Sequence, residues 1–103
     1  MKQFLIKYRL AHGSQEAWHQ EISRFISALD SDPELAGRVS YRCMRRGAGP
    51  EYLHIAATQD DEAAKVLQTR AYFKHYTEQT RAVSGAAVDV TPLELIAGTA
   101  YRL

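Results

Sequence analysis

The chain has 103 residues, of which 46% are hydrophobic and 24% are charged, and this excludes the polar, highly charged composition of disordered proteins. Its net charge of +1 excludes the strongly basic surface typical of proteins that bind nucleic acid or a membrane surface. One cysteine cannot form an internal disulfide, and no apolar run approaches the roughly 20 residues that cross a bilayer. We therefore expect a single domain over residues 1–103, located in the cytoplasm.

The first half of the chain predicts a strand, a helix and a short helical turn. Residues 3–10 alternate between apolar and charged side chains, which is the pattern of a strand with one covered face. Ser14 is a suitable N-cap for the amphipathic helix that follows, in which apolar residues recur at helical spacing as far as Leu29. The stretch SDPELAG, ending at Gly37, predicts a short second helical turn.

The second half predicts a hairpin, a long helix and a last strand. The alternating side chains of residues 39–46 and 51–58 predict two strands, joined by the turn sequence GAGP. Residues 60–83 lack Gly and Pro and predict a long helix, capped by Thr58 and Asp61 and bent near Arg70. Ser84 and Gly85 end this helix. The stretch AAVDVTPLELIAGT supplies a last strand, which the proline favours as an edge strand.

This order, β-α-β-β-α-β, predicts an α+β fold of the ferredoxin-like kind. Four strands would form an antiparallel sheet, with both main helices on one face. If the apolar strand faces lie under the helices, Tyr52 and His54 point to the opposite, open face together with Arg42 and Asp89. His54 is then a half-exposed strand residue, or part of a buried polar set with Arg42 and Asp89 once a second copy covers that face.

The open face and the long tail after Pro92 favour a homodimer formed through the sheet faces and the tail. RNA binding across an open sheet stays a weaker alternative, because the third strand supplies only one aromatic residue, Tyr52. We therefore expect the partner to be a second copy, and we expect no nucleic acid or membrane.

Aromatic residues concentrate in TRAYFKHYTEQTRAV, residues 69–83. A stripe that includes Phe73 and Tyr76 recurs at steps of three and four, and we expect it to face the sheet as core. Tyr72 and His75 form a neighbouring row at the border between buried and solvated surface, where polar tips can point into a cavity. The alternative for this row is an amphipathic flank with its polar ends in water.

Several kinds of site are disfavoured by spacing. No two of the four histidines stand at a spacing typical of metal ligands, so no metal is expected. The GAG at residues 47–49 lies in a hairpin and not between a strand and a helix, which disfavours nucleotide binding. Cys43 lies in mid-strand among apolar neighbours, where a thiol is usually inert.

Four features together point to a family. They are the opening strand FLIKYRL, Gly37 before VSYRCMRR, the stretch DDEAAKVLQTRAYF, and the extended tail after PLELI. In these features the chain, over residues 3–100, resembles the antibiotic biosynthesis monooxygenase-like group of dimeric α+β barrel proteins. The resemblance implies two sheets packed face to face in a homodimer, with a pocket between the sheet and the helices of each subunit. It also implies cofactor-independent oxygen chemistry on phenolic, quinol or polyketide-like compounds.

The first functional hypothesis is therefore an enzyme that acts without a cofactor on a small aromatic compound. His75 is the expected base, because the free pKa of histidine lies near neutrality, and Tyr72 is expected to assist it. An isomerase or cyclase would need the same base and no oxygen. The residues expected to bind the ring of the substrate are Tyr8, Trp18, Tyr41, Phe73 and Tyr76.

The second hypothesis is a non-catalytic dimer that binds a small ligand or serves as an accessory domain. The family often has a Glu-x-Trp at the end of the third strand, and the matching positions here are Ala56 and Thr58. The absence of these polar residues favours the non-catalytic hypothesis.

Overall fold

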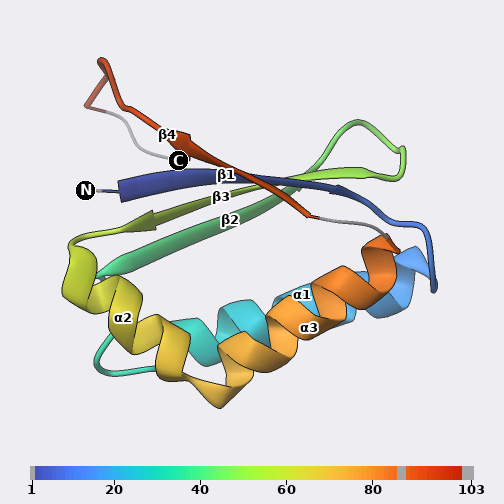
Figure 1. Cartoon of the computed structure of the whole chain (residues 1–103), viewed down its shortest axis with the longest axis horizontal. Helices are drawn as coiled ribbons and strands as arrows, with labels where there is room; N and C mark the ends of the chain where they lie inside the picture. Colours follow the sequence, from blue (N-terminus) through green and yellow to red (C-terminus); the bar gives the residue numbers. More distant parts are fainter. Residues whose placement is uncertain (1, 86–87, 101–103) are drawn as a thin grey trace.

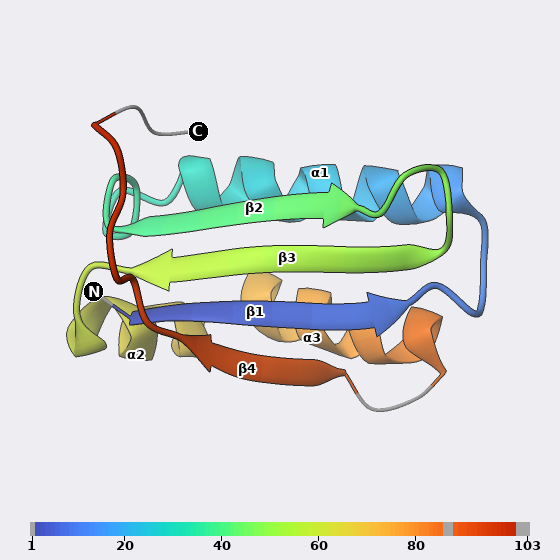
Figure 2. The ribbon, with the colours of Figure 1, turned by 90° about the horizontal axis from the view of Figure 1, so that it is seen from above.

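A computed structural model describes residues 2–85 and 88–100 of the chain. The described elements, in chain order, are β1 (Lys2–Arg9), α1 (Gln15–Asp30), β2 (Val39–Arg45), β3 (Glu51–Thr58), α2 (Asp61–Thr69), α3 (Ala71–Ser84) and β4 (Asp89–Leu93). The strands form one antiparallel sheet in the order β2-β3-β1-β4. All three helices lie on one face of it (Figures 1 and 2). The predicted α+β, ferredoxin-like fold is therefore confirmed.

The ends of the elements follow from local sequence signals. The side chain of Ser14 accepts a hydrogen bond from the Ala17 amide at 3.1 Å and caps α1, as predicted. β4 pairs only with β1, so Pro92 stands on an edge strand, the position in a sheet that tolerates proline, as predicted. The predicted last strand began at residue 86, but residues 86 and 87, like the tail residues 101–103, lie outside the described part. None of the described helices is long and apolar enough to cross a membrane.

The predicted long helix is two helices that meet at Arg70. The backbone of Arg70 is extended, with φ −76° and ψ 131°, so α2 ends and α3 begins at this residue. The bend was predicted, but the cap was not, because Asp60 and not Thr58 accepts the hydrogen bond from Ala63 at 2.8 Å. Gly85 ends α3 with φ 63°, a left-handed conformation that strongly favours glycine.

Asp32 fastens this bend to the loop after α1. Its carboxylate accepts hydrogen bonds from the Arg70 guanidinium (Nε) and from the Tyr72 hydroxyl, both at 2.8 Å. These bonds, with that from Arg70 as the largest cause, lower the pKa of Asp32 to about 2. Residues 33–38 form turns, as the predicted short helical turn requires: the Asp32 carbonyl accepts from the amide four residues later at 2.8 Å, and the Asp32 side chain accepts from the Glu34 amide.

Replacing Asp32 by Asn is expected to lower the free energy of unfolding at pH 7 by about 1.5–3 kcal/mol, the range for hydrogen bonds to a charged partner. Urea unfolding would measure the change. The matched control is Glu34→Gln, which removes the other carboxylate on Arg70, an exposed one, and is expected to cost less than about 1 kcal/mol. Equal losses in the two variants would contradict the role given to Asp32.

The register of β3 corrects the predicted faces of the sheet. Directly paired residues share a face, and Tyr52 pairs with Tyr8 while His54 pairs with Ile6. Tyr52 and His54 therefore point toward the helices, where they are 2% and 0% exposed, and the prediction that they lie on the open face was wrong. The open face instead carries the other parity of β3, including Leu53.

Candidate functional site

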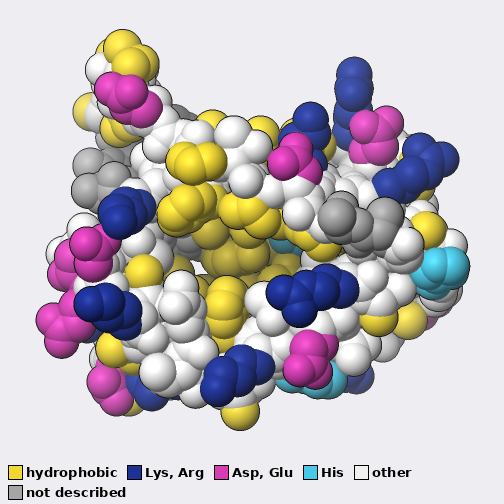
Figure 3. All heavy atoms as spheres, in the orientation of Figure 1, with side chains coloured by type: hydrophobic (Ala, Val, Ile, Leu, Met, Phe, Trp, Pro, Cys, Tyr) yellow, Lys and Arg dark blue, Asp and Glu magenta, His cyan; other side chains and the backbone are white. Residues whose placement is uncertain are grey.

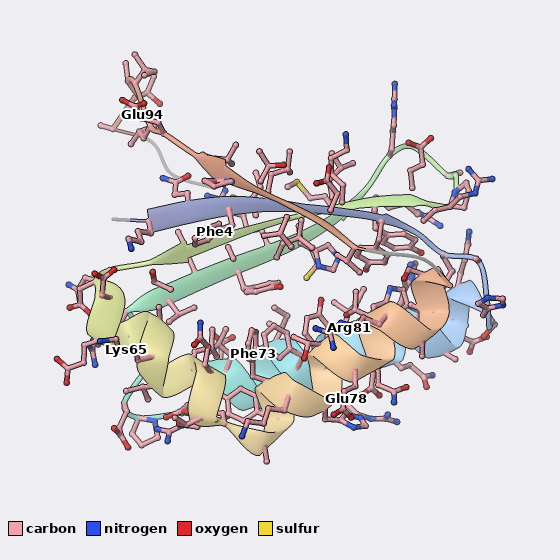
Figure 4. The ribbon with its side chains drawn as sticks, viewed as in Figure 1. Phe4, Lys65, Phe73, Glu78, Arg81 and Glu94 are labelled. Carbon is pink, nitrogen blue, oxygen red and sulfur yellow. The ribbon has the colours of Figure 1, made fainter. Side chains whose placement is uncertain are left out.

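A cavity of about 580 Å³ opens between the sheet and the pair α2 and α3. Most of its lining is hydrocarbon or aromatic, with Phe4 and Tyr41 from the sheet and Leu67 and Phe73 from the helices. Figure 3 shows the opening as a hollow lined by hydrophobic side chains. Figure 4 shows Phe4 on the sheet across from α3, which carries Phe73 and Arg81. Such a cavity suits a small, largely apolar ligand.

Small side chains create part of this space. Ala56 on β3 stands between Phe4 and Tyr41 in the strand register, and Ala64 faces the cavity from α2. Thr58, at the end of β3, also lines the cavity, and its hydroxyl has no hydrogen-bond partner within the described residues although it is buried. A polar ligand atom is one way to satisfy such a group.

A buried chain of hydrogen bonds runs from the core to the wall of the cavity. The Trp18 indole N–H donates to the Tyr8 hydroxyl at 2.8 Å, and that hydroxyl lies 2.9 Å from His54 Nε2. On the other side of the ring, His54 Nδ1 lies 2.9 Å from the Tyr76 hydroxyl. His54 and Tyr76 both line the cavity. We call these four residues the buried hydrogen-bond chain.

The donors and acceptors along this chain determine which atom donates the hydrogen in each bond. The indole of Trp18 can only donate, so the Tyr8 oxygen accepts, and the Tyr8 hydrogen is left for His54 Nε2. We infer that His54 carries its hydrogen on Nδ1 and donates it to the Tyr76 oxygen. The other tautomer would leave the Tyr8 hydrogen without an acceptor among the described residues.

The Tyr76 hydrogen is then the end of the chain. Among the described residues it has two neighbours besides His54: Cys43 Sγ at 3.8 Å, a weak acceptor at a long distance, and the Tyr41 hydroxyl, with which the Tyr76 hydroxyl forms a hydrogen bond. The Tyr76 ring is held in place by Phe25, which stacks on it with ring centroids 4.0 Å apart. A hydroxyl held this rigidly in the cavity wall can turn its hydrogen from Cys43 or Tyr41 toward the oxygen of a bound ligand.

Burial keeps the inner wall of the cavity uncharged. Desolvation lowers the pKa of His54 from 6.5 to about 4, so the ring is neutral at pH 7. Desolvation also raises the pKa of the Cys43 thiol to about 11 and the pKa values of Tyr41 and Tyr76 well above their ordinary value. In the described part of the chain, no group of His, Cys, Asp and Glu side chains is arranged to hold a metal ion.

Three of the five predicted ring-binding residues line the cavity, namely Tyr41, Phe73 and Tyr76. Tyr8 and Trp18 lie in the core behind that wall, at 7% and 3% exposure, and reach it only through the buried hydrogen-bond chain.

The two predicted catalytic residues do not line the cavity. The side chain of His75 is 60% exposed, and its Nε2 lies 2.8 Å from a Glu21 carboxylate oxygen on α1. The Tyr72 hydroxyl donates to Asp32, and burial raises the pKa of Tyr72 to about 12. A catalytic role for His75 and Tyr72 stays a prediction, and the cavity does not lie beside them.

Sequence reasoning missed His54 and Arg81 as cavity residues. No signal within β3 marks His54, because only the register of the folded sheet places Tyr52 opposite Tyr8 and His54 on the same inner face. The signal for Arg81 was its position one residue after Thr80 on the edge of the sheet-facing stripe of α3.

Comparison with known proteins finds similarity at the level of structure. No protein-family model and no curated protein matches the sequence. SnoaB, a cofactor-independent oxygenase from Streptomyces nogalater, has a solved structure that is 15% identical, with 97% of each chain covered and a TM-score of 0.74. Rv0793 from Mycobacterium tuberculosis is 13% identical, with 96% of this chain and 98% of that chain covered and a TM-score of 0.76.

A third solved structure is described only as an antibiotic biosynthesis monooxygenase. It is 12% identical and covers 94% of this chain and 100% of its own, with a TM-score of 0.71. Identities this low establish the fold and leave the chemistry open. The chain has the fold of the antibiotic biosynthesis monooxygenase-like proteins.

Proposed function

We propose that the chain is a monooxygenase-like protein that works without a cofactor on a small aromatic, quinol or polyketide-like compound. The observation that carries this proposal is the apolar cavity, which places the uncharged pair His54 and Tyr76 in its wall. The fold, which the chain shares with the cofactor-independent oxygenase SnoaB, supports it by analogy.

The cavity residues suit a substrate that supplies its own electrons. An anthrone is such a compound: its methylene group becomes a carbonyl, one oxygen atom of O₂ enters the product and the other leaves as water. The four electrons that O₂ accepts come from that methylene carbon, so no external reductant is needed. Loss of a methylene proton to a solvent water molecule first gives an enolate, whose negative charge rests on oxygen. The Tyr76 hydroxyl would donate a hydrogen bond to that oxygen, while Phe4 and Phe73 hold the rings.

Oxygen uptake on a panel of anthrones and hydroquinones tests this function. Tyr76→Phe is expected to lower the rate about 10- to 100-fold, since it removes a hydrogen bond to a charged transition state. The matched control is Tyr52→Phe, which removes a hydroxyl from the same aromatic core, but one bonded to His19 and outside the cavity lining. Equal losses in the two variants would indicate general damage to the core and would count against the role of Tyr76.

The alternative is a non-catalytic dimer that binds a small ligand or acts as an accessory protein. Two observations favour it: both ring nitrogens of His54 are already hydrogen-bonded, and the predicted base His75 pairs with Glu21 outside the cavity. No oxygen uptake across the panel, together with ligand-induced shifts in melting temperature, would support this alternative over the enzyme.

The proposal includes a homodimer through the open face of the sheet and the tail. The open face presents apolar side chains in the middle of the sheet, and Leu95 and Ile96 of the tail are 66% and 83% exposed. The tail rises from the sheet on the side away from the helices, where Glu94 is labelled (Figure 4). Exposed apolar surface of this kind is typical of a protein interface.

A further inference from the structure

Arg81 stands at the rim of the cavity and is its one charged lining residue within the described part of the chain. Its side chain extends from α3 toward the space under the sheet (Figure 4), and basic side chains border the opening in Figure 3. The residue is exposed, and no described carboxylate pairs with its guanidinium. The other arginines of the helices differ from it, since Arg24 pairs with Glu21 and Arg70 pairs with Asp32.

The rest of the cavity cannot bind an anion through charge. His54 is neutral, and the remaining polar lining groups are hydroxyls and one amide. The aromatic walls favour a planar ring system. A guanidinium at the mouth of an apolar cavity complements a ligand with a ring system at one end and a carboxylate at the other, because its N–H groups match the two carboxylate oxygens.

We propose that Arg81 makes the cavity selective for aromatic carboxylates, with the rings inside and the carboxylate on the guanidinium at the mouth. This inference rests on the proposed function in one respect, namely that an aromatic compound occupies the cavity. It adds a charge requirement that the apolar lining alone does not impose.

Calorimetric titration of the full chain with two matched compounds tests the inference. The probes are 2-naphthoate, an aromatic carboxylate, and 2-naphthamide, which has nearly the same shape and no charge. The wild-type chain is expected to bind the naphthoate about fivefold more tightly at low salt, as for an exposed ion pair. The preference is expected to shrink at 1 M salt, where the screening length falls to about 3 Å.

Arg81→Gln is expected to bind both compounds equally, with its affinity for naphthamide unchanged, which also shows that the cavity is still formed. The matched control is Arg24→Gln, which removes the same charge from α1 away from the cavity and is expected to keep the preference. Should Arg81→Gln bind neither compound, Arg81→Lys decides: a retained preference supports the inference, and a lost one overturns it.

Three other results would overturn the inference: no preference in the wild-type chain, no binding of either probe, or equal loss of preference in Arg24→Gln. The oxygen-uptake experiment is independent of this one. Uptake on anthrones together with equal binding of the two probes would refute the charge requirement and leave the proposed function standing. A clear preference for naphthoate without oxygen uptake would support the charge requirement and count against the proposed function.

Discussion

Lowering the pH from 7 to 4.5 is expected to remove about 2–3 kcal/mol from the free energy of unfolding through His54 alone. The folded chain holds this ring neutral down to a pKa of about 4, while the unfolded chain binds a proton near pH 6.5. Between these values the unfolded state binds more protons, so acid favours unfolding. The stabilisation is fully present above pH 6.5 and is lost as the pH falls toward 4.

Around His54, the neighbouring tyrosines and Cys43 do not titrate between pH 7 and pH 4.5. Burial keeps the tyrosines around it and Cys43 neutral throughout, and the pKa of Asp32 lies far lower, at about 2. Urea unfolding at a series of pH values would measure the slope. His54→Gln is expected to flatten it, because the side chain at this position then binds no proton. A wild-type slope equal to that of His54→Gln would contradict the prediction.

The elements were predictable because each rests on signals within a few residues. Ser14 caps α1 by accepting from the amide three residues later, and Gly85 ends α3 with a conformation that glycine adopts readily. None of these features needs knowledge of what packs against the element.

The faces of β3 were not predictable in the same way. Leu53 and Ile55 are as hydrophobic as an inner face should be, yet they lie outside, and the polar-tipped Tyr52 and His54 lie inside. A period of two separates the two faces of a strand but does not say which one the helices cover. The pairing with Tyr8 on β1 settles it, and that pairing depends on the whole sheet.

The cavity also escaped prediction, because no single segment encodes it. It arises where Ala56 on the sheet and Ala64 on α2 leave room between larger neighbours, and where the helix pair bends away at Arg70. We expected a pocket beside Tyr72 and His75 because polar side-chain ends at the border of a buried helix face can point into a cavity. Instead, Asp32 accepts a hydrogen bond from the Tyr72 hydroxyl, and Glu21 pairs with His75.

The corrected faces strengthen the argument for a second copy on the open side of the sheet. Leu5 pairs with Ile55, and Leu53 pairs with Met44, so apolar side chains from three strands adjoin there. Met44 is 43% exposed in the single chain. A two-fold axis through this face would place the same patch of each copy against the other, and the tails that rise on this side would flank it.

Leu53→Glu is therefore expected to convert a dimer into a monomer, as measured by sedimentation at micromolar concentration. Leu53 is half-buried in the single chain, so the substitution should leave folding nearly intact, which circular dichroism would check. In the dimer it would bury a carboxylate in each copy, which Lys7 across the strand pair only partly neutralises. A cost of about 1.5–3 kcal/mol per copy, or about 3–6 kcal/mol per dimer, weakens association by about two to four orders of magnitude. The control is Ala71→Glu, which adds the same charge at the exposed start of α3 and should sediment as a dimer. A wild-type chain that sediments as a monomer would refute the interface, and the cavity would then have to act within a single chain.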